Sequence, residues 1–337
     1  MSTIKTKFLG VGHYLPSRVL TNDQLTKEYG IDTSDEWIQT RTGIKQRHFV
    51  EPNQTNVDLG YEAAIRAIET AKIKKEEIDF ILYATLSQDH EFPGNGCFLQ
   101  ARLGLPGVPA MDIRNQCTGF LYCLATADAL IKTGQYKRIL IVGSEIHSRG
   151  LDLSTRGRDV AILFGDGAGA AVLGATNSED ISGILSTHLH ADGGYAKELW
   201  TEAPGSAFHP SRVTNLQIEE GLIFPKMNGR TVFVHAVKRM PEAVMEALNH
   251  NAHTLEDLDL LVPHQANIRI NEAVAKGLGL PDRKVFNTID RFGNTTAATI
   301  PIGLAEAVIQ GKLKQGMLVA LAAFGSGFTW GSCLLRW

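Results

Sequence analysis

The two halves of this 337-residue chain carry the same short segments in the same order. Asp79 pairs with Asp259, Pro106 with Pro281, and Gly134 with Gly311, at spacings of 180, 175 and 177 residues. Three ordered matches at nearly one spacing indicate an internal duplication. The matched segments are KKEEIDFILYAT (74–85) with TLEDLDLLVPHQ (254–265), LGLP (103–106) with LGLP (278–281), and GQYKRILIVGSE (134–145) with GKLKQGMLVALAAFG (311–325).

Short apolar runs alternate with segments of helical periodicity in each half. DFILYAT (79–85) has the length and flanking residues of a buried strand, whereas YEAAIRAIETAKI (61–73) repeats apolar residues every three to four positions. This alternation is typical of an α/β fold. We therefore predict two similar α/β halves, residues 1–177 and 178–337, related by a pseudo-twofold axis that brings their equivalent loops together.

Composition and charge exclude several classes of protein. The chain is 44% hydrophobic and 20% charged, as is usual for a globular protein, and its net charge of -3 gives no general attraction to nucleic acid or anionic membrane. No window of 18 apolar residues occurs, and Gly10 and Pro16 interrupt the N-terminal segment before a signal-peptide core is formed. We expect a cytoplasmic protein with neither nucleic acid nor membrane as a partner.

The cysteines and histidines do not predict a metal site. The four cysteines show no CxxC spacing, which favours reduced thiols over disulfides or zinc ligands. His188, His190 and Asp192 match no zinc-binding spacing, so we expect them to form a hydrogen-bonded loop. The cysteines are Cys97, Cys117, Cys123 and Cys333.

Cys117 is the candidate nucleophile. It follows the strand-like VPAMDI (108–113) and precedes the helical pattern FLYCLATADALIKTG (120–134). A cysteine at a helix N-terminus is exposed to unpaired N–H groups and to the positive end of the helix dipole, both of which favour the thiolate. We therefore expect a lowered thiol pKa and a reactive sulfur, although a small buried core residue is the alternative.

His264 and Asn294 complete a set of groups suited to acyl transfer. His264 ends the apolar run DLLVP and is followed by polar residues, and Asn294 lies 13 residues after Pro281, much as Cys117 lies 11 after Pro106. The duplication therefore predicts that Asn294 and Cys117 face one another. A thiolate accepts an acyl group, and two neutral donors stabilise a carbanion or enolate.

The sequence resembles the β-ketoacyl-[acyl-carrier-protein] synthase III family of the thiolase superfamily along nearly its whole length. The resemblance implies an α/β fold of thiolase-like duplicated αβαβα halves packed as a layered unit, and a homodimer. The segments that carry it are residues 35–48, 115–120, 164–174, 187–195, 262–270, 292–301 and 323–332.

The resemblance also implies the catalytic roles. Cys117 accepts the acyl group, while His264 and Asn294 stabilise the enolate formed when a malonyl thioester loses carbon dioxide. The backbone N–H groups of Cys117 and Ser326 form the oxyanion hole. Acyl-CoA is a substrate, and the resemblance implies no metal and no cofactor.

Further positions match residues that bind the substrate in the family. Trp37 and Arg41 match residues that sandwich the adenine of coenzyme A, and Arg158 matches another contact on the adenine side. Flat guanidinium and indole groups suit stacking, and arginine also pairs with phosphate.

The remaining carried-over positions lie further along the chain. Asn228 and Gly229 match the path of the pantetheine, Asn267 and Arg269 belong to the substrate-binding set, and Phe92 matches a residue that reaches the acyl pocket of the partner subunit. Arg269 is also a candidate contact for the acyl-carrier protein or a phosphate.

Several positions depart from the family pattern. Asn115 and Gln116 replace the usual small residues before the nucleophile, Ser326 replaces a glycine, and Val234 stands where a lysine often supports docking of the carrier protein. The segment 191–233 is longer than usual. These departures affect the choice of acyl group and of second substrate.

From these residues we predict an acyltransferase of fatty acid biosynthesis. It transfers an acyl group from acyl-CoA to Cys117 and then performs a decarboxylative Claisen condensation with malonyl-acyl-carrier protein. One alternative is condensation of two acyl thioesters without decarboxylation, or acyl transfer to an oxygen or nitrogen acceptor in secondary metabolism. Another alternative is a non-catalytic protein that binds acyl-CoA.

Overall fold

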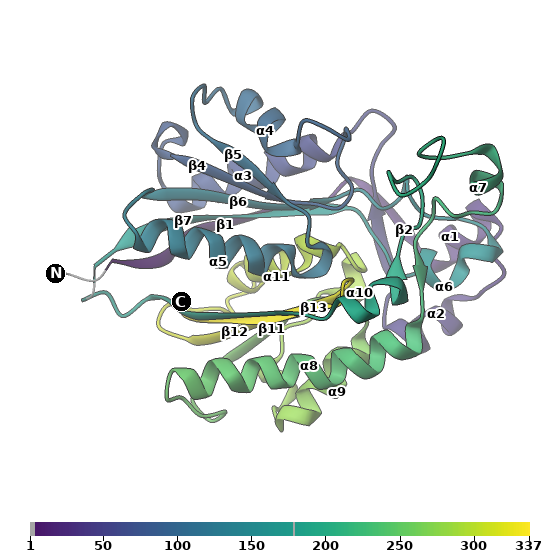
Figure 1. Cartoon of the computed structure of the whole chain (residues 1–337). Helices are drawn as coiled ribbons and strands as arrows, with labels where there is room; N and C mark the ends of the chain where they lie inside the picture. Colours follow the sequence, from purple (N-terminus) through teal and green to yellow (C-terminus); the bar gives the residue numbers. More distant parts are fainter. Residues whose placement is uncertain (1–3, 178) are drawn as a thin grey trace.

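The structure, a computed structural model, describes residues 4–177 and 179–337. Its elements stack in five layers: helices, a sheet, helices, a second sheet and helices (Figure 1). The outer layers contain α3 (Asn56–Ala71) with α4 (Asn95–Leu103), and α8 (Gly229–His250) with α9 (Ile268–Leu278); the central layer contains α5 (Gly119–Lys132) and α11 (Thr299–Ile309). The layered α/β fold predicted from the sequence is confirmed, and the five layers belong to both halves together.

The described residues form one five-stranded and one four-stranded main sheet. The first has the order β1 (Lys5–Tyr14), β7 (Gly167–Thr176), β6 (Arg138–Glu145), β4 (Phe80–Ala84) and β5 (Ala110–Ile113). The second has the order β8 (Gly183–Ala191), β13 (Thr329–Arg336), β12 (Leu318–Gly325) and β11 (Leu260–Pro263). β4 is parallel to β5 and β6, and β11 is parallel to β12, whereas the other pairs in these sheets are antiparallel.

Shorter elements surround the two sheets. They are β2 (Arg18–Thr21), α1 (Asn22–Tyr29), α2 (Asp35–Thr42), β3 (Gln46–Phe49), η1 (Lys75–Glu77), η2 (Gln116–Thr118), η3 (Thr155–Gly157), α6 (Arg158–Ala161), η4 (Gly193–Glu198), β9 (Leu199–Trp200), α7 (Asn215–Glu219), β10 (Lys226–Met227), η5 (Asp282–Lys284), α10 (Ile289–Phe292) and η6 (Thr296–Ala298).

The duplication is visible in the order and spacing of equivalent elements. β4 and β11, α5 and α11, and β6 and β12 each begin 180 residues apart. At the site this spacing pairs Cys117 with Ala297, rather than with Asn294 as the sequence matches suggested. The strands of the first sheet all end by Thr176 and those of the second begin at Gly183, so we propose the boundary at 177/178, although residue 178 lies outside the described residues.

The central helices are buried between the two sheets. α11 is buried from Thr299 to Ala307, because both of its sides face apolar strands, and one core cluster joins Leu304 to Ile141 of β6 and Leu321 of β12. α8 instead buries one face and exposes the other, as expected of an outer helix. This packing holds the N-terminal ends of α5 and α11 in fixed positions.

No helix in the described part of the chain is both long and apolar enough to span a membrane.

Candidate active site

Cys117 lies in η2, between the end of β5 and the first residue of α5. Its side chain is buried against the end of β12, a strand of the other half. A Cβ added to Gly325 would lie 2.5 Å from Cys117 Cβ and 2.9 Å from its Sγ. Glycine is therefore required here, because it lets the backbone of β12 approach the sulfur.

Burial controls the ionisation of this thiol. Burial and, to a smaller extent, the nearby Glu145 carboxyl raise the pKa of Cys117 to about 12, although the backbone N–H groups of Cys117 and Ser326 act in the opposite direction. The predicted lowering of the thiol pKa is therefore wrong for the resting site. Desolvation of the anion outweighs the effect of the helix N-terminus.

His264 follows β11 and is 2% exposed. Its Nδ1 is 2.7 Å from Thr299 Oγ1, and that hydroxyl oxygen is 2.9 Å from the carbonyl oxygen of Thr296. Its Nε2 has no hydrogen-bond partner among the described residues. Burial lowers the pKa of His264 to about 3, so the imidazole is neutral at pH 7 and has one donor and one acceptor nitrogen.

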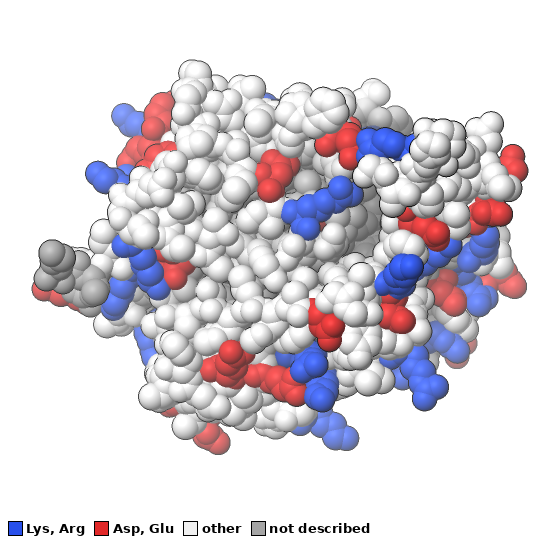
Figure 2. Space-filling view, in the orientation of Figure 1, with Lys and Arg blue, Asp and Glu red and all other residues white. Residues whose placement is uncertain are grey.

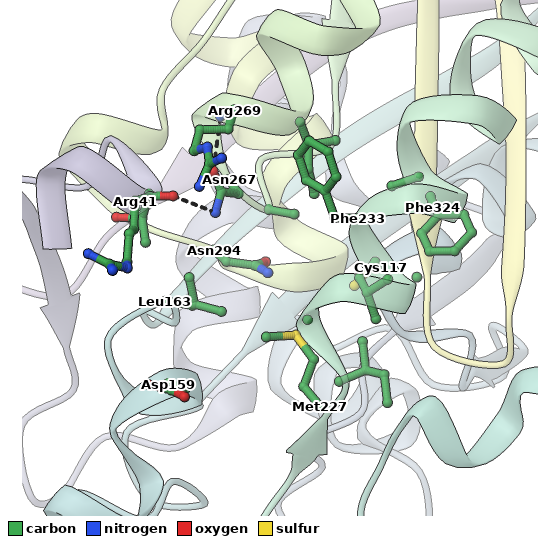
Figure 3. Close-up of a pocket in the computed structure, with 18 of the residues that line it drawn as sticks. Arg41, Cys117, Asp159, Leu163, Met227, Phe233, Asn267, Arg269, Asn294 and Phe324 are labelled. Atoms are coloured by element: carbon green, nitrogen blue, oxygen red, sulfur yellow. Dashed lines mark hydrogen bonds between the residues drawn. The ribbon is translucent and has the colours of Figure 1, made fainter. Parts of the chain in front are cut away.

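Asn294 is held by its backbone and by one side of its amide. Its N–H donates to the Leu163 carbonyl at 2.8 Å, and its carbonyl accepts from Gly165 N–H at 3.0 Å. Asn294 Oδ1 accepts from Thr296 N–H at 2.8 Å, which leaves the Nδ2 donors for another partner. Figure 3 shows the side chain of Asn294 pointing toward the space beside Cys117.

A cavity of about 710 Å³ brings these three side chains together. Trp37, Arg41 and Arg158 also line it, as do Gly229, Asn267 and Arg269. The guanidinium carbons of Arg41 and Arg158 lie 4.1 and 5.0 Å from the centroid of the Trp37 ring. The cavity therefore joins a reactive centre to a cluster of arginine and indole groups that can stack on a flat ring or bind phosphate.

Asn267 organises the wall of this cavity. Its Nδ2 donates to the Arg41 carbonyl at 2.9 Å, and its Oδ1 accepts from Arg269 N–H at 2.9 Å at the start of α9 (Figure 3). Both ends of the amide thus serve to hold the two arginine-bearing segments together.

Three predicted site residues do not line this cavity. Asn228 caps α8 by accepting from Thr231 N–H at 3.3 Å and does not line this cavity, although its neighbour Gly229 does. Phe92 is 82% exposed and lies outside the cavity. Ser326 lines a second cavity, and its hydroxyl donates to the Leu199 carbonyl, so its side chain is turned away from the sulfur while its N–H faces it.

The second cavity, of about 470 Å³, also reaches Cys117. Its lining includes Gln116, His147 and Thr296, three polar residues close to the nucleophile. Sequence reasoning assigned no role to His147, Thr296, Thr299 or Glu145. Each of these side chains has a partner that lies 35 to 149 residues away in the chain, so no local pattern identifies them.

Two family models match this chain. The model described as 3-oxoacyl-[acyl-carrier-protein] synthase III matches residues 111–193, and the model of the C-terminal part of the same enzyme matches residues 248–337. The first match contains Cys117, and the second contains His264 and Asn294.

Similar proteins cover nearly the whole chain. The β-ketoacyl-[acyl-carrier-protein] synthase III of Escherichia coli strain K12 is 48% identical over 331 residues, which are 98% of this chain and 99% of that protein. The protein of the same name from Xanthomonas euvesicatoria is 46% identical over 334 residues, or 99% of both chains. The crystal structure of 3-oxoacyl-[acyl-carrier-protein] synthase III from Aquifex aeolicus has a TM-score of 0.89 and 42% identity, and covers 98% of this chain and 100% of that one.

Proposed function

The chain belongs to the β-ketoacyl-[acyl-carrier-protein] synthase III family, and we propose from this membership how its own residues divide the reaction. It is an acyl-transferring condensing enzyme of fatty acid biosynthesis. Its substrates are an acyl-CoA and a malonyl group on acyl-carrier protein. The observation that carries this proposal is the single cavity lined by Cys117, His264 and Asn294, with the arginine and tryptophan cluster on the same cavity.

In the first step Cys117 takes the acyl group. Its sulfur attacks the thioester carbonyl, the bond from carbon to the sulfur of coenzyme A breaks, and the thiol proton leaves with coenzyme A. The N–H groups of Cys117 and Ser326, which already point at the sulfur, donate to the oxyanion. Trp37, Arg41 and Arg158 bind the adenine and phosphates.

In the second step the other half of the molecule stabilises an enolate. The malonyl thioester loses carbon dioxide, and its oxygen accepts from Asn294 Nδ2 and His264 Nε2. For Nε2 to donate, Nδ1 must accept the Thr299 hydroxyl proton at 2.7 Å, so that hydroxyl must turn its proton away from the Thr296 carbonyl, to which it donates in this structure. The carbanion then attacks the acyl carbonyl and a C–C bond forms. The bond from that carbon to the Cys117 sulfur breaks, and the released thiolate takes up a proton from water. These steps need no metal and no redox cofactor.

We also infer a homodimer. β5 has β4 as its sheet neighbour on one side and lies at the edge of the first sheet, where Met111 is exposed. Figure 2 shows that the centre of the face over α5 carries few charged side chains, as is usual in the core of an interface. Phe92, which is exposed in one protomer, would then enter the acyl cavity of the other.

The state of the cysteines supports a cytoplasmic location. All four are unpaired in the described structure, as expected in a reducing compartment.

Intact-mass measurement after incubation with acetyl-CoA tests the assignment of the nucleophile. We expect one acetyl adduct on the wild-type chain and on Cys97→Ala, whose cysteine is exposed, and none on Cys117→Ala. An adduct that persists in Cys117→Ala would contradict the proposal. Release of carbon dioxide from malonyl-acyl-carrier protein separates this reaction from condensation without decarboxylation.

A further inference from the structure

The second cavity differs from the first in what surrounds Cys117. Trp37, Arg41 and Arg158 do not line it, although Arg114 and Trp200 do. Its apolar part includes Leu86, Ile146 and Leu151. Gln116, His147 and Thr296 add polar groups to this wall. A plain alkyl chain cannot form hydrogen bonds with these polar groups.

His147 is placed as a fixed polar group. It follows β6, is 7% exposed, and its backbone N–H donates to Asp166 Oδ1 at 2.7 Å. Its ring lies 4.6 Å from that of Phe164, and its Nε2 is 2.5 Å from Thr296 Oγ1. No hydrogen bond between described residues engages Nδ1, and this nitrogen, unlike His264 Nε2, is not fully buried, so it can pair with a group in the cavity.

Gln116 and Thr296 reach this cavity from strained turns. Their φ angles are +43° and +49°, and they are the first residues of η2 and η6, which are equivalent in the two halves. A positive φ is unfavourable for a residue with a side chain, and most of all for β-branched threonine, so such positions indicate a functional constraint. The side-chain amide of Gln116 makes no hydrogen bond to the described residues.

We propose that this cavity selects an acyl group with a hydroxyl on its β carbon, so that the preferred CoA substrate is a short 3-hydroxyacyl thioester. This inference rests on the proposed function, because the acyl group is bound to Cys117 when it occupies the cavity. A hydroxyl both donates and accepts, so it pairs with His147 Nδ1 and the Gln116 amide together. Gln116 adjoins Cys117 in the chain, which places the hydroxyl near the thioester.

A plain alkyl group fits this cavity less well. It covers His147 Nδ1 and the Gln116 amide without giving either a partner, and unpaired polar groups lose their hydration. A site built to bond a hydroxyl therefore discriminates against the analogue that lacks it.

The test compares four-carbon CoA thioesters that differ in one oxygen. The kcat/KM of coenzyme A release is measured for butyryl-CoA and for both enantiomers of 3-hydroxybutyryl-CoA. We expect one enantiomer to exceed butyryl-CoA by about tenfold or more, since one hydrogen bond to a fixed group is worth about that factor. A wild-type enzyme that uses butyryl-CoA equally well or better overturns the inference.

Variants assign the preference to its residues. In His147→Leu and in Gln116→Leu the ratio of hydroxylated to plain substrate should fall toward one, and His147→Gln should recover part of it. A ratio that stays at the wild-type value in both leucine variants contradicts the assignment. Because the wild-type ratio is itself decisive, the test stands even where a variant fails to fold.

Acylation by acetyl-CoA tests the proposed function separately from this inference. Acetylation of wild-type Cys117 without a preference for the hydroxyl overturns the inference and leaves the function in place. Failure of every CoA thioester to acylate Cys117 overturns both.

Discussion

The turn that carries Cys117 in the first half and its equivalent at Ala297 in the second half share their backbone geometry but present different chemical groups. Each begins with a residue at positive φ, leads into a central helix, and packs against the end of a strand from the other half. Cys117 lies against Gly325 of β12, and Ala297 lies against Gly143 of β6, where an added Cβ would be 2.4 Å from its carbonyl oxygen.

The residues at the C-terminal ends of β6 and β12 explain the difference. Next to Gly325, the N–H of Ser326 points toward the Cys117 sulfur. At the equivalent end of β6, the carboxyl of Glu145 accepts from the backbone N–H of Ala297. One turn thus presents a nucleophile to a donor, and the other is fixed by a buried acid while Asn294 beside it provides donors. A duplicated backbone has kept its geometry and divided the reaction between its copies.

We expect the largest effect from replacing Gly325, and a different effect from replacing Gly143. Gly325→Ala forces a methyl group against Cys117, so we expect acylation by acetyl-CoA to fall about 100-fold or more as the sulfur moves away from its N–H donors. Gly143→Ala should instead cost about 1 to 3 kcal/mol of stability by overpacking and leave acylation per folded molecule within about tenfold of wild type. The burst of coenzyme A release, scaled by the folded fraction from circular dichroism, measures both. Equal loss of acylation in both variants would contradict the division between the turns.

Glu145 should make stability depend on pH. Burial raises its pKa from 4.5 to about 7, against the opposing hydrogen bonds from Ser87, Leu86, Thr85 and Ala297. The native state therefore holds a proton between these values that the unfolded state has lost. Its contribution is complete below pH 4.5 and is lost as the pH rises through about 7.

The measurement is urea unfolding of wild type and Glu145→Gln at several pH values. We expect the wild-type free energy of unfolding to fall by about 1 to 3 kcal/mol relative to the variant across that interval. Parallel pH profiles of the two proteins would show that Glu145 does not carry this proton.

The smallest effect should come from Thr299. Thr299→Val keeps the shape of the side chain but removes the partner of His264 Nδ1. We expect kcat for condensation to fall about tenfold, the value of one buried hydrogen bond, with acylation nearly unchanged and Thr299→Ser restoring the rate. Loss of acylation and condensation to the same extent would instead indicate a general structural role.

Periodicity and local motifs were enough to predict an α/β fold of two similar halves and the place of Cys117 at a turn before a helix, whereas the layered packing was implied by the family resemblance. They failed where the outcome depended on distant contacts. The predicted lowering of the thiol pKa was wrong because Cys117 is buried, in part against Gly325, which lies in the other half. Counting from the matched prolines placed Asn294 near the equivalent of Cys117, but Ala297 holds that position because five more residues separate Pro281 from the start of α11 than separate Pro106 from the start of α5.

Other features had no local signal in the sequence at all. The positive φ of Gln116 and Thr296 is not marked by glycine, so composition does not show it. The bonds of His264 to Thr299 and of His147 to Thr296 join segments 35 and 149 residues apart. Such contacts become apparent only when the two halves are packed together.

The most direct test of the divided site is to measure the two half-reactions in Cys117→Ala and Asn294→Ala, using acetyl-CoA for enzyme acylation and malonyl-acyl-carrier protein for release of carbon dioxide. The account predicts that Asn294→Ala is acetylated but loses decarboxylation by about 100-fold or more, whereas Cys117→Ala is not acetylated and still decarboxylates. If Asn294→Ala released carbon dioxide at the wild-type rate, or if Cys117→Ala became acetylated, the proposed roles of the two halves would be contradicted.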